Sequence, residues 1–147
     1  MKYFSLFVPA VVAALAVAES DTLHFDNTYD NGSQSLNVVA CSTGATGLET
    51  LGFTHSDFQS LPTFPNIGAF SAVSGFGSAE CGTCWNVAFT NAAGKTTSLN
   101  AIAIDHAGAG LINLSQEAMD TLTGGNAVQF GAVPVTATQV AKSVCGL

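Results

Sequence analysis

Asp105 is the carboxylate in this sequence that is best placed for chemistry. It follows the apolar run Leu99–Ile104 and precedes a loop of sequence His-Ala-Gly-Ala-Gly. A charged group at the end of a buried strand, beside a glycine-rich loop that admits a ligand, is typical of a binding or catalytic position. The alternative is an Asp that holds its own loop by accepting hydrogen bonds from nearby backbone N–H groups. We predict His106 to be a loop residue rather than a base.

A second polar cluster, residues 25–32, contains Asp26, Asn27, Tyr29 and Asp30. Amides and carboxylates hydrogen-bond sugar hydroxyls, and the face of a tyrosine packs on a pyranose ring. The alternative is an ordinary polar turn. Hydrolysis of a glycoside by acid–base chemistry needs two carboxylates about 5–9.5 Å apart. A hydrolase would therefore pair Asp105 with Asp26 or Asp30.

Met1–Ala18 has the features of a secretory signal peptide. Lys2 is followed by an apolar run, and the segment ends Ala-Val-Ala, so we expect cleavage after Ala18. The run is too short for a stable membrane span. The sequence thus predicts a secreted mature domain of residues 19–147, without membrane insertion.

The four cysteines, Cys41, Cys81, Cys84 and Cys145, are an even set in a chain expected to be secreted. They indicate two structural disulfides. A redox C-x-x-C site is less favoured, because the residues after Cys84 alternate like a strand rather than opening a helix. Spacing alone leaves the pairing open. The three scattered histidines have no ligand-like spacing, so we expect neither a metal nor a cofactor.

The composition limits the kinds of partner that the protein can bind. Charged residues make up only 9% of the chain, and the predicted mature part has ten acids, two lysines and 41 Ser, Thr, Asn and Gln residues. A net charge of −8 without a basic cluster argues against nucleic acid, whose phosphates need Lys and Arg. The abundant hydroxyl and amide groups favour an uncharged ligand such as a glycan.

Several segments look like strands, because they are rich in β-branched or aromatic residues and bounded by Gly, Asn and Ser. The predicted strands are Leu23–Asn27, Leu36–Ala40, Trp85–Thr90, Ser98–Ile104, Ala127–Phe130 and Val133–Val140. Many short strands with two bridges favour a closed β-barrel.

Two short helices are expected between the strands. Ser56 begins a capping-box spacing, and Ser115 caps a helix that Gly124 ends. The Pro- and Gly-rich segment Leu61–Gly77 is predicted to be an ordered loop whose Phe64, Phe70 and Phe76 belong to the core. Asn31 and Asn113 begin glycosylation sequons.

Five motifs along the mature chain resemble the cerato-platanin family of small secreted fungal proteins. They are Asp-Asn-Thr-Tyr-Asp-Asn at 26–31, Cys-Gly-Thr-Cys-Trp at 81–85, Ala-Ile-Asp-His-Ala-Gly at 103–108, Leu-Thr-Gly-Gly-Asn-Ala at 122–127, and the ending at 135–147. The resemblance implies a mainly β fold, a six-stranded double-psi β-barrel with short helices. It also implies the pairing Cys41–Cys81 and Cys84–Cys145.

The resemblance further implies a non-catalytic protein, secreted or wall-associated, that binds chitin or N-acetylglucosamine oligomers, or cellulose, and loosens polysaccharide as expansins do. Asp105 matches the polar groove residue of the family, with Asn27, Tyr29 and Asp30 nearby. Family members often elicit plant defence, which implies a plant surface receptor as another partner. The alternative hypotheses are a glycoside hydrolase on the same barrel and a surface-active, self-assembling protein.

Overall fold

The structure is a computed structural model that describes residues 16–147. Most of the predicted signal peptide therefore lies outside the described residues. Cleavage after Ala18 and the domain range 19–147 remain predictions. Ala18 is the first residue of the first strand, so cleavage there would leave that strand to begin at Glu19.

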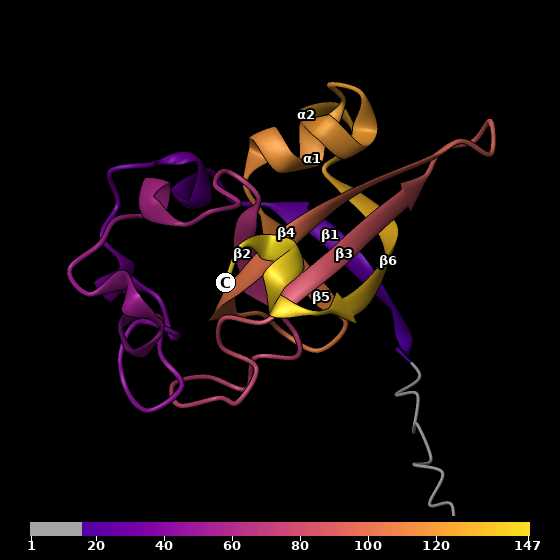
Figure 1. Ribbon diagram of the computed structural model, residues 1–147. Coiled ribbons are helices and arrows are strands. Elements are labelled where there is room, and N and C mark those ends of the chain that lie inside the picture. The colour runs from indigo at the N-terminus through magenta and orange to yellow at the C-terminus, as the bar shows by residue number, and fades with distance from the viewer. Residues whose placement is uncertain (1–15) are drawn as a thin grey trace, which may run out of the picture.

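Six strands close into a barrel in the order β1-β5-β2-β4-β3-β6 (Figure 1). The strands are β1 (Ala18–Phe25), β2 (Ile67–Phe70), β3 (Cys84–Thr90), β4 (Thr96–His106), β5 (Leu111–Leu114) and β6 (Ala132–Val140). The pairs β1–β5 and β2–β4 are parallel, and the other neighbouring strands are antiparallel. The mainly β, six-stranded double-psi barrel is confirmed.

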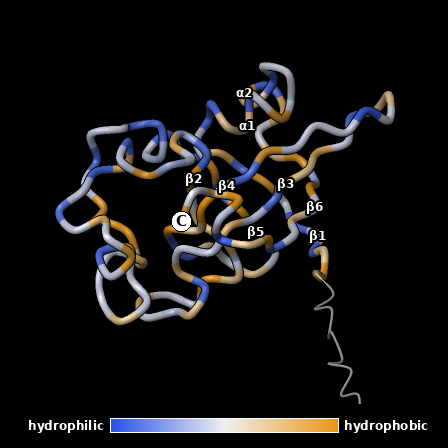
Figure 2. The backbone as a smooth tube through the Cα atoms, in the orientation of Figure 1, coloured by the Kyte–Doolittle hydropathy of each residue, from blue (hydrophilic) through white to orange (hydrophobic). Residues whose placement is uncertain are grey.

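The barrel interior is apolar because alternate residues of each strand point inward. Leu23, Ile104 and Leu114 are fully buried, and the Phe70 and Trp85 rings stack with their centroids 5.7 Å apart. The tube in Figure 2 shows apolar segments along the barrel strands. Within the described residues, no helix is long and apolar enough to cross a membrane.

Helices and turns surround the barrel. The helices are α1 (Gln116–Thr123) and α2 (Ala127–Phe130), and short helical turns span Asn27–Asp30, Leu36–Val38, Glu49–Phe53, Phe58–Ser60 and Lys142–Cys145. Helices α1 and α2 lie together beside the barrel, and the long segment from about residue 30 to 65 loops out on one side (Figure 1).

Both disulfides have the pairing that the resemblance implies. Cys41–Cys81 ties the long loop to the segment before β3, and Cys84–Cys145 ties the first residue of β3 to the C-terminal turn. Each closes a loop of tens of residues, so each stabilises the fold by restricting the unfolded chain.

The helix capped by Ser115 is confirmed. The Ser115 hydroxyl accepts from Ala118 N–H, and Gly124 ends α1 in a left-handed conformation. The Ser56 prediction is displaced by a residue: Asp57 precedes a 3₁₀ turn and makes no side-chain capping bond.

Two predicted strands are wrong, and two observed strands were not predicted. Leu36–Ala40 contains a 3₁₀ turn capped by Ser35, and Ala127–Phe130 is helix α2, whose first N–H, that of Ala127, donates to Asp120 Oδ1 at 2.9 Å. Strands β2 and β5 have four residues each; β2 lies within the predicted loop Leu61–Gly77, and no strand was predicted at Leu111–Leu114. Both the wrong and the missed strands are short, so their local sequence carries little signal.

The prediction for the three phenylalanines of Leu61–Gly77 holds for two of them. Phe70 is buried in the barrel, and Phe64 is half-buried against the core, but Phe76 is 72% exposed. The expectation that Phe76 is a core residue is wrong. Gly75 and Gly77 flank it with positive φ, in a turn that carries its ring outward.

Candidate functional site

Asp105 lies near the end of β4, half-buried, with its carboxylate held by backbone donors. Its Oδ1 atom accepts from Ala40 N–H at 3.0 Å and from His106 N–H at 2.9 Å. Strand β4 reaches this point beside β2, where the register shifts between Gly68 and Ala69. Gly68 is required here because a Cβ would lie 2.0 Å from the Asn113 carbonyl oxygen.

Tyr29 approaches Asp105 from the turn Asn27–Asp30. Asp26 caps this turn by accepting from Thr28 N–H at 2.8 Å. The Tyr29 hydroxyl donates to Asp105 Oδ2 at 3.1 Å. Its ring is only 5% exposed and packs against Phe58, with the ring centroids 6.1 Å apart.

The pKa of Tyr29 is raised far above its ordinary value. Burial is the main cause, because it disfavours the charged phenolate. The negative charge of Asp105, the hydrogen bond to it and the charge of Asp26 raise the pKa further. The phenol therefore stays protonated and acts as a permanent donor to Asp105.

Asn27 and Asp30 extend from the same turn toward helix α1. Asp30 accepts from the first two N–H groups of the helix, those of Gln116 at 2.9 Å and Glu117 at 3.0 Å. The Asn27 amide donates to Gln116 Oε1 at 2.9 Å. A carboxylate at a helix N-terminus is stabilised by the free N–H groups and the helix dipole.

The four predicted site residues thus form two clusters joined by one turn. Tyr29 points to Asp105, whereas Asn27 and Asp30 hold the start of α1. The expectation that the face of Tyr29 packs on a sugar ring is not met in this structure, because the ring is buried.

Two groups at the site could not be found from the sequence. The Ala40 N–H and Gln116 lie far along the chain from their partners, and one is a backbone group that carries no sequence signal. His106, predicted to be a loop residue, instead ends β4; it is exposed, and its Nδ1 donates to the Val73 carbonyl. That nitrogen is therefore not available as a base.

The other acids near Tyr29 also hold backbone. Asp26 caps the turn and Asp30 caps α1, so each has an oxygen occupied by N–H donors. In the part of the chain that the structure describes, no group of three or more His, Cys, Asp and Glu side chains could hold a metal ion.

The two sequons differ in their surroundings. Asn31 is exposed at the end of the Asn27–Asp30 turn, and its Oδ1 accepts from Ser33 Oγ at 2.9 Å. Asn113 lies half-buried in β5, and the Ser115 of its sequon is fully buried as the α1 cap. Asn31 is the more accessible of the two predicted glycosylation sites.

A family model described as Cerato-platanin matches residues 22–147. The chain belongs to the cerato-platanin family. Cerato-platanins are generally secreted, non-catalytic fungal proteins, and the chain resembles cerato-platanin 2 from M. perniciosa at 55% identity, with a TM-score of 0.81 over 88% of this chain and all of that one.

Two curated relatives have other names. The heat-stable 19 kDa antigen of Coccidioides immitis is 36% identical, covering 97% of this chain and 92% of the antigen. The Asp f 15 allergen homologue of Arthroderma benhamiae is 40% identical, covering 91% of this chain, which spans only 62% of that relative.

Proposed function

We propose that this cerato-platanin is a secreted, non-catalytic protein that binds an uncharged polysaccharide at Asp105. The proposed ligands are chitin or N-acetylglucosamine oligomers, or cellulose. Secretion is supported by the N-terminal segment and by the family. Recognition by a plant surface receptor, with elicitation of plant defence, is a further proposed role supported by the family resemblance alone.

The observation that carries the proposal is the fixed, partly accessible carboxylate of Asp105. A carboxylate has about four acceptor positions. Protein donors use three of them, from Ala40, His106 and Tyr29. The remaining position is held in a defined direction, and a sugar hydroxyl can donate to it without reorganising the protein.

This arrangement supports loosening by competition. Chains of a packed polysaccharide hydrogen-bond to one another through hydroxyl groups. A sugar hydroxyl that donates to Asp105 gives up its hydrogen bond to a neighbouring polysaccharide chain and forms one to the protein instead. No covalent bond breaks in this process, so it needs neither a nucleophile nor a proton donor.

The proposed absence of hydrolysis is supported by the roles of the acids. A glycosidase needs one carboxyl group to donate a proton and a second to act as base or nucleophile. Asp26, Asp30 and Asp105 each hold a backbone segment through N–H donors. Sustained release of reducing ends from chitin or cellulose, lost in Asp105→Ala, would contradict the proposal.

The binding test is Asp105→Asn. Both backbone donors go to Oδ1 and Tyr29 goes to Oδ2, so an Asn can keep Oδ1 as acceptor and donate its amide to the Tyr29 oxygen. The variant keeps the shape and removes the charge. Because hydrogen bonds to ionised groups are roughly twice as strong as neutral ones, we expect about fivefold to tenfold weaker binding of soluble chitin oligomers by calorimetry.

Asp57→Asn is the matched control. Asp57 makes no capping bond to the Phe58–Ser60 turn and accepts from Gln59 Nε2 at 2.8 Å. The Asn oxygen can keep that bond, so this variant removes one negative charge without touching Asp105. Equal affinity in wild type, Asp105→Asn and Asp57→Asn would show that the Asp105 carboxylate does not contact the sugar.

A further inference from the structure

The outer surface of four neighbouring strands, β1, β6, β3 and β4, carries small neutral side chains in a regular array. The register places Ser20 beside Thr136, Thr136 beside Ala88, and Ala88 beside Ser98. These four residues form one row across the four strands. We call the surface around this row the hydroxyl face.

Neighbouring rows continue the array on both sides. The Asn86 amide donates to Asn100 Oδ1 at 2.9 Å, and the hydroxyls of Thr90 and Thr96 are 2.7 Å apart. These side-chain contacts confirm that β3 and β4 present these positions on one face. Strands are about 4.8 Å apart and same-face residues about 6.8 Å apart along a strand, so the polar groups repeat in two directions.

The hydroxyl face has no ionisable side chain at its outward positions within residues 18–22, 134–138, 86–90 and 96–100. The chain is otherwise acidic. Asp26, Asp30 and Asp105 lie around the turn and α1, outside this face. A charged group loses much solvation free energy when a ligand covers it, whereas a hydroxyl or amide that regains a hydrogen bond loses little.

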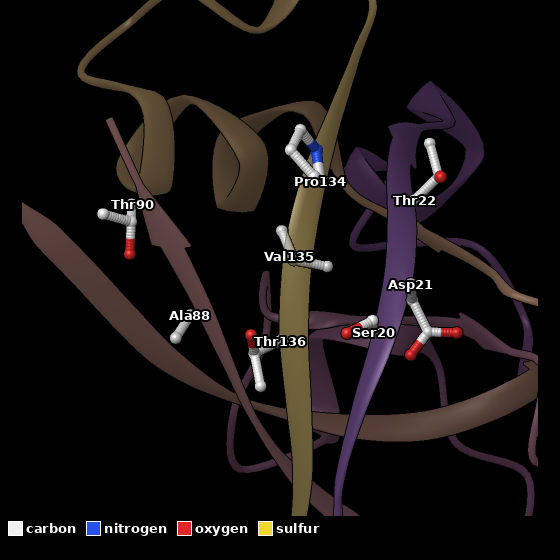
Figure 3. A pocket seen from close by; sticks show the side chains of 8 residues that line it. All are labelled: Ser20, Asp21, Thr22, Ala88, Thr90, Pro134, Val135 and Thr136. Carbon is white, nitrogen blue, oxygen red and sulfur yellow. The ribbon is translucent and has the colours of Figure 1, made fainter. Parts of the chain in front are cut away.

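An open groove of about 450 Å³ runs over this face (Figure 3). Ser20, Thr22, Thr90 and Thr136 line it together with the apolar Ala88, Pro134 and Val135, and Figure 3 shows Ser20 and Thr136 on adjacent strands. Asp21 is the one acid of this lining; it is only 8% exposed, and its Oδ1 accepts from Ser71 Oγ at 3.1 Å. In the described part of the chain, the hydroxyls of Ser20, Thr136 and Ser98 make no hydrogen bond to protein groups. They are free to donate to and accept from a ligand.

We propose that the hydroxyl face is a second binding surface, separate from Asp105, that adsorbs to the surface of insoluble chitin. The choice of ligand rests on the proposed function. A packed polysaccharide surface is neutral and presents repeated hydroxyl and amide groups, which complement a neutral array of the same groups. Asp105 would bind a single exposed chain, and the hydroxyl face would hold the protein against many chains.

The test introduces a negative charge at the centre of the face. Thr136→Glu and Ser98→Glu place a carboxylate on β6 and β4 respectively. Ser143→Glu is the matched control, because Ser143 is exposed on the C-terminal turn and makes no side-chain hydrogen bond among the described residues. Thermal unfolding and amide NMR verify that each variant is folded, and two variants on separate strands keep the test informative if one of them misfolds.

Adsorption to chitin particles is measured by depletion, and binding of soluble chitin oligomers by calorimetry. We expect both face variants to lower the particle partition constant about tenfold or more, which is about 1.4 kcal/mol. Oligomer affinity should stay within about twofold of wild type, and Ser143→Glu should match wild type in both assays.

Normal adsorption of both folded face variants would overturn the inference. Parallel loss of oligomer affinity in the face variants would overturn it too, because the two surfaces would then be one site. If wild type binds no oligomer while the face variants lose adsorption, the Asp105 site fails and the hydroxyl face stands.

Discussion

Replacing Tyr29 by Phe should remove a pH-dependent part of the stability at alkaline pH. The pKa of Tyr29 is raised in the folded protein, first by burial and then by Asp105. Tyrosine has a pKa of about 10 in an unfolded chain. Below that pH the phenol is protonated in both states, and its contribution is complete. Above it, the unfolded chain loses the proton while the folded protein keeps it, so stability falls.

The slope follows from the linkage of proton binding to folding. One proton that is released only on unfolding lowers the free energy of unfolding by about 1.4 kcal/mol per pH unit. Because the unfolded tyrosine is only half ionised at about pH 10, that slope is reached only above this pH. Between about pH 10 and pH 11, wild type should therefore lose about 1 kcal/mol more than Tyr29→Phe, and between about pH 8 and pH 11 about 1.4 kcal/mol more. At neutral pH the variant should be less stable by about 1.5–3 kcal/mol, because it lacks a hydrogen bond to a charged group.

Urea unfolding from pH 8 to pH 11 measures both effects. Comparison with Tyr29→Phe removes the contributions of all other groups, which both proteins share. Tyr3 lies in the predicted signal peptide, so Tyr29 is the only tyrosine of the predicted mature protein. Near-ultraviolet absorbance of tyrosinate therefore reports Tyr29 directly. Titration of native Tyr29 near pH 10, or equal slopes in the two proteins, would refute the reasoning.

Three further variants test other parts of the structure. Asp30→Ala should lower the free energy of unfolding by about 1 kcal/mol, measured in urea, because the first N–H groups of α1 lose their acceptor; no change would remove Asp30 from its capping role. Phe70→Ala should lower the free energy of unfolding by about 3–5 kcal/mol and Phe76→Ala by less than about 0.5 kcal/mol, because only Phe70 is buried. Equal losses of stability in the two variants would contradict this difference in burial. Replacing Cys84 and Cys145 together by Ser should cost about 4 kcal/mol from loop entropy, and a thermal midpoint like that of wild type would show the bridge to be dispensable.

Local signals predicted the elements that local interactions determine. The α1 helix was predicted because Ser115 and Gly124 supply its caps within the helix itself. Strand β4 was predicted because its long apolar run favours a strand over other secondary structures. Segment Ala127–Phe130 was predicted wrongly as a strand, because the Asp120 carboxylate that caps it as a helix belongs to another element.

Strands β2 and β5 depend on the closed barrel. Ile67–Phe70 is buried at all four positions between parallel β4 and antiparallel β5, so it has no alternation of polar and apolar residues. A short continuous run of this kind can be read as strand, helix or loop. Its glycine, Gly68, is explained only by the approach of the β5 backbone.

The sequence identified the residues of the candidate site but not their roles. Asp105 and Tyr29 were both named, and the structure brings them into contact. The structure supports Asp105 as a residue that holds backbone N–H groups, and its role in binding a ligand stays a prediction. The contacts of Asn27 and Asp30 with the start of α1 could not be predicted, because they depend on how the Asn27–Asp30 turn packs against that helix.

Amide NMR during a titration with soluble chitin oligomers tests the proposed function most directly. The N–H groups of Ala40 and His106 donate to Asp105, so they should shift when a sugar hydroxyl reaches that carboxylate. We predict saturable shifts at these two amides in wild type and much weaker ones at the same oligomer concentration in Asp105→Asn. Saturable shifts that leave both amides unchanged, or that persist with equal affinity in Asp105→Asn, would contradict a sugar site at Asp105.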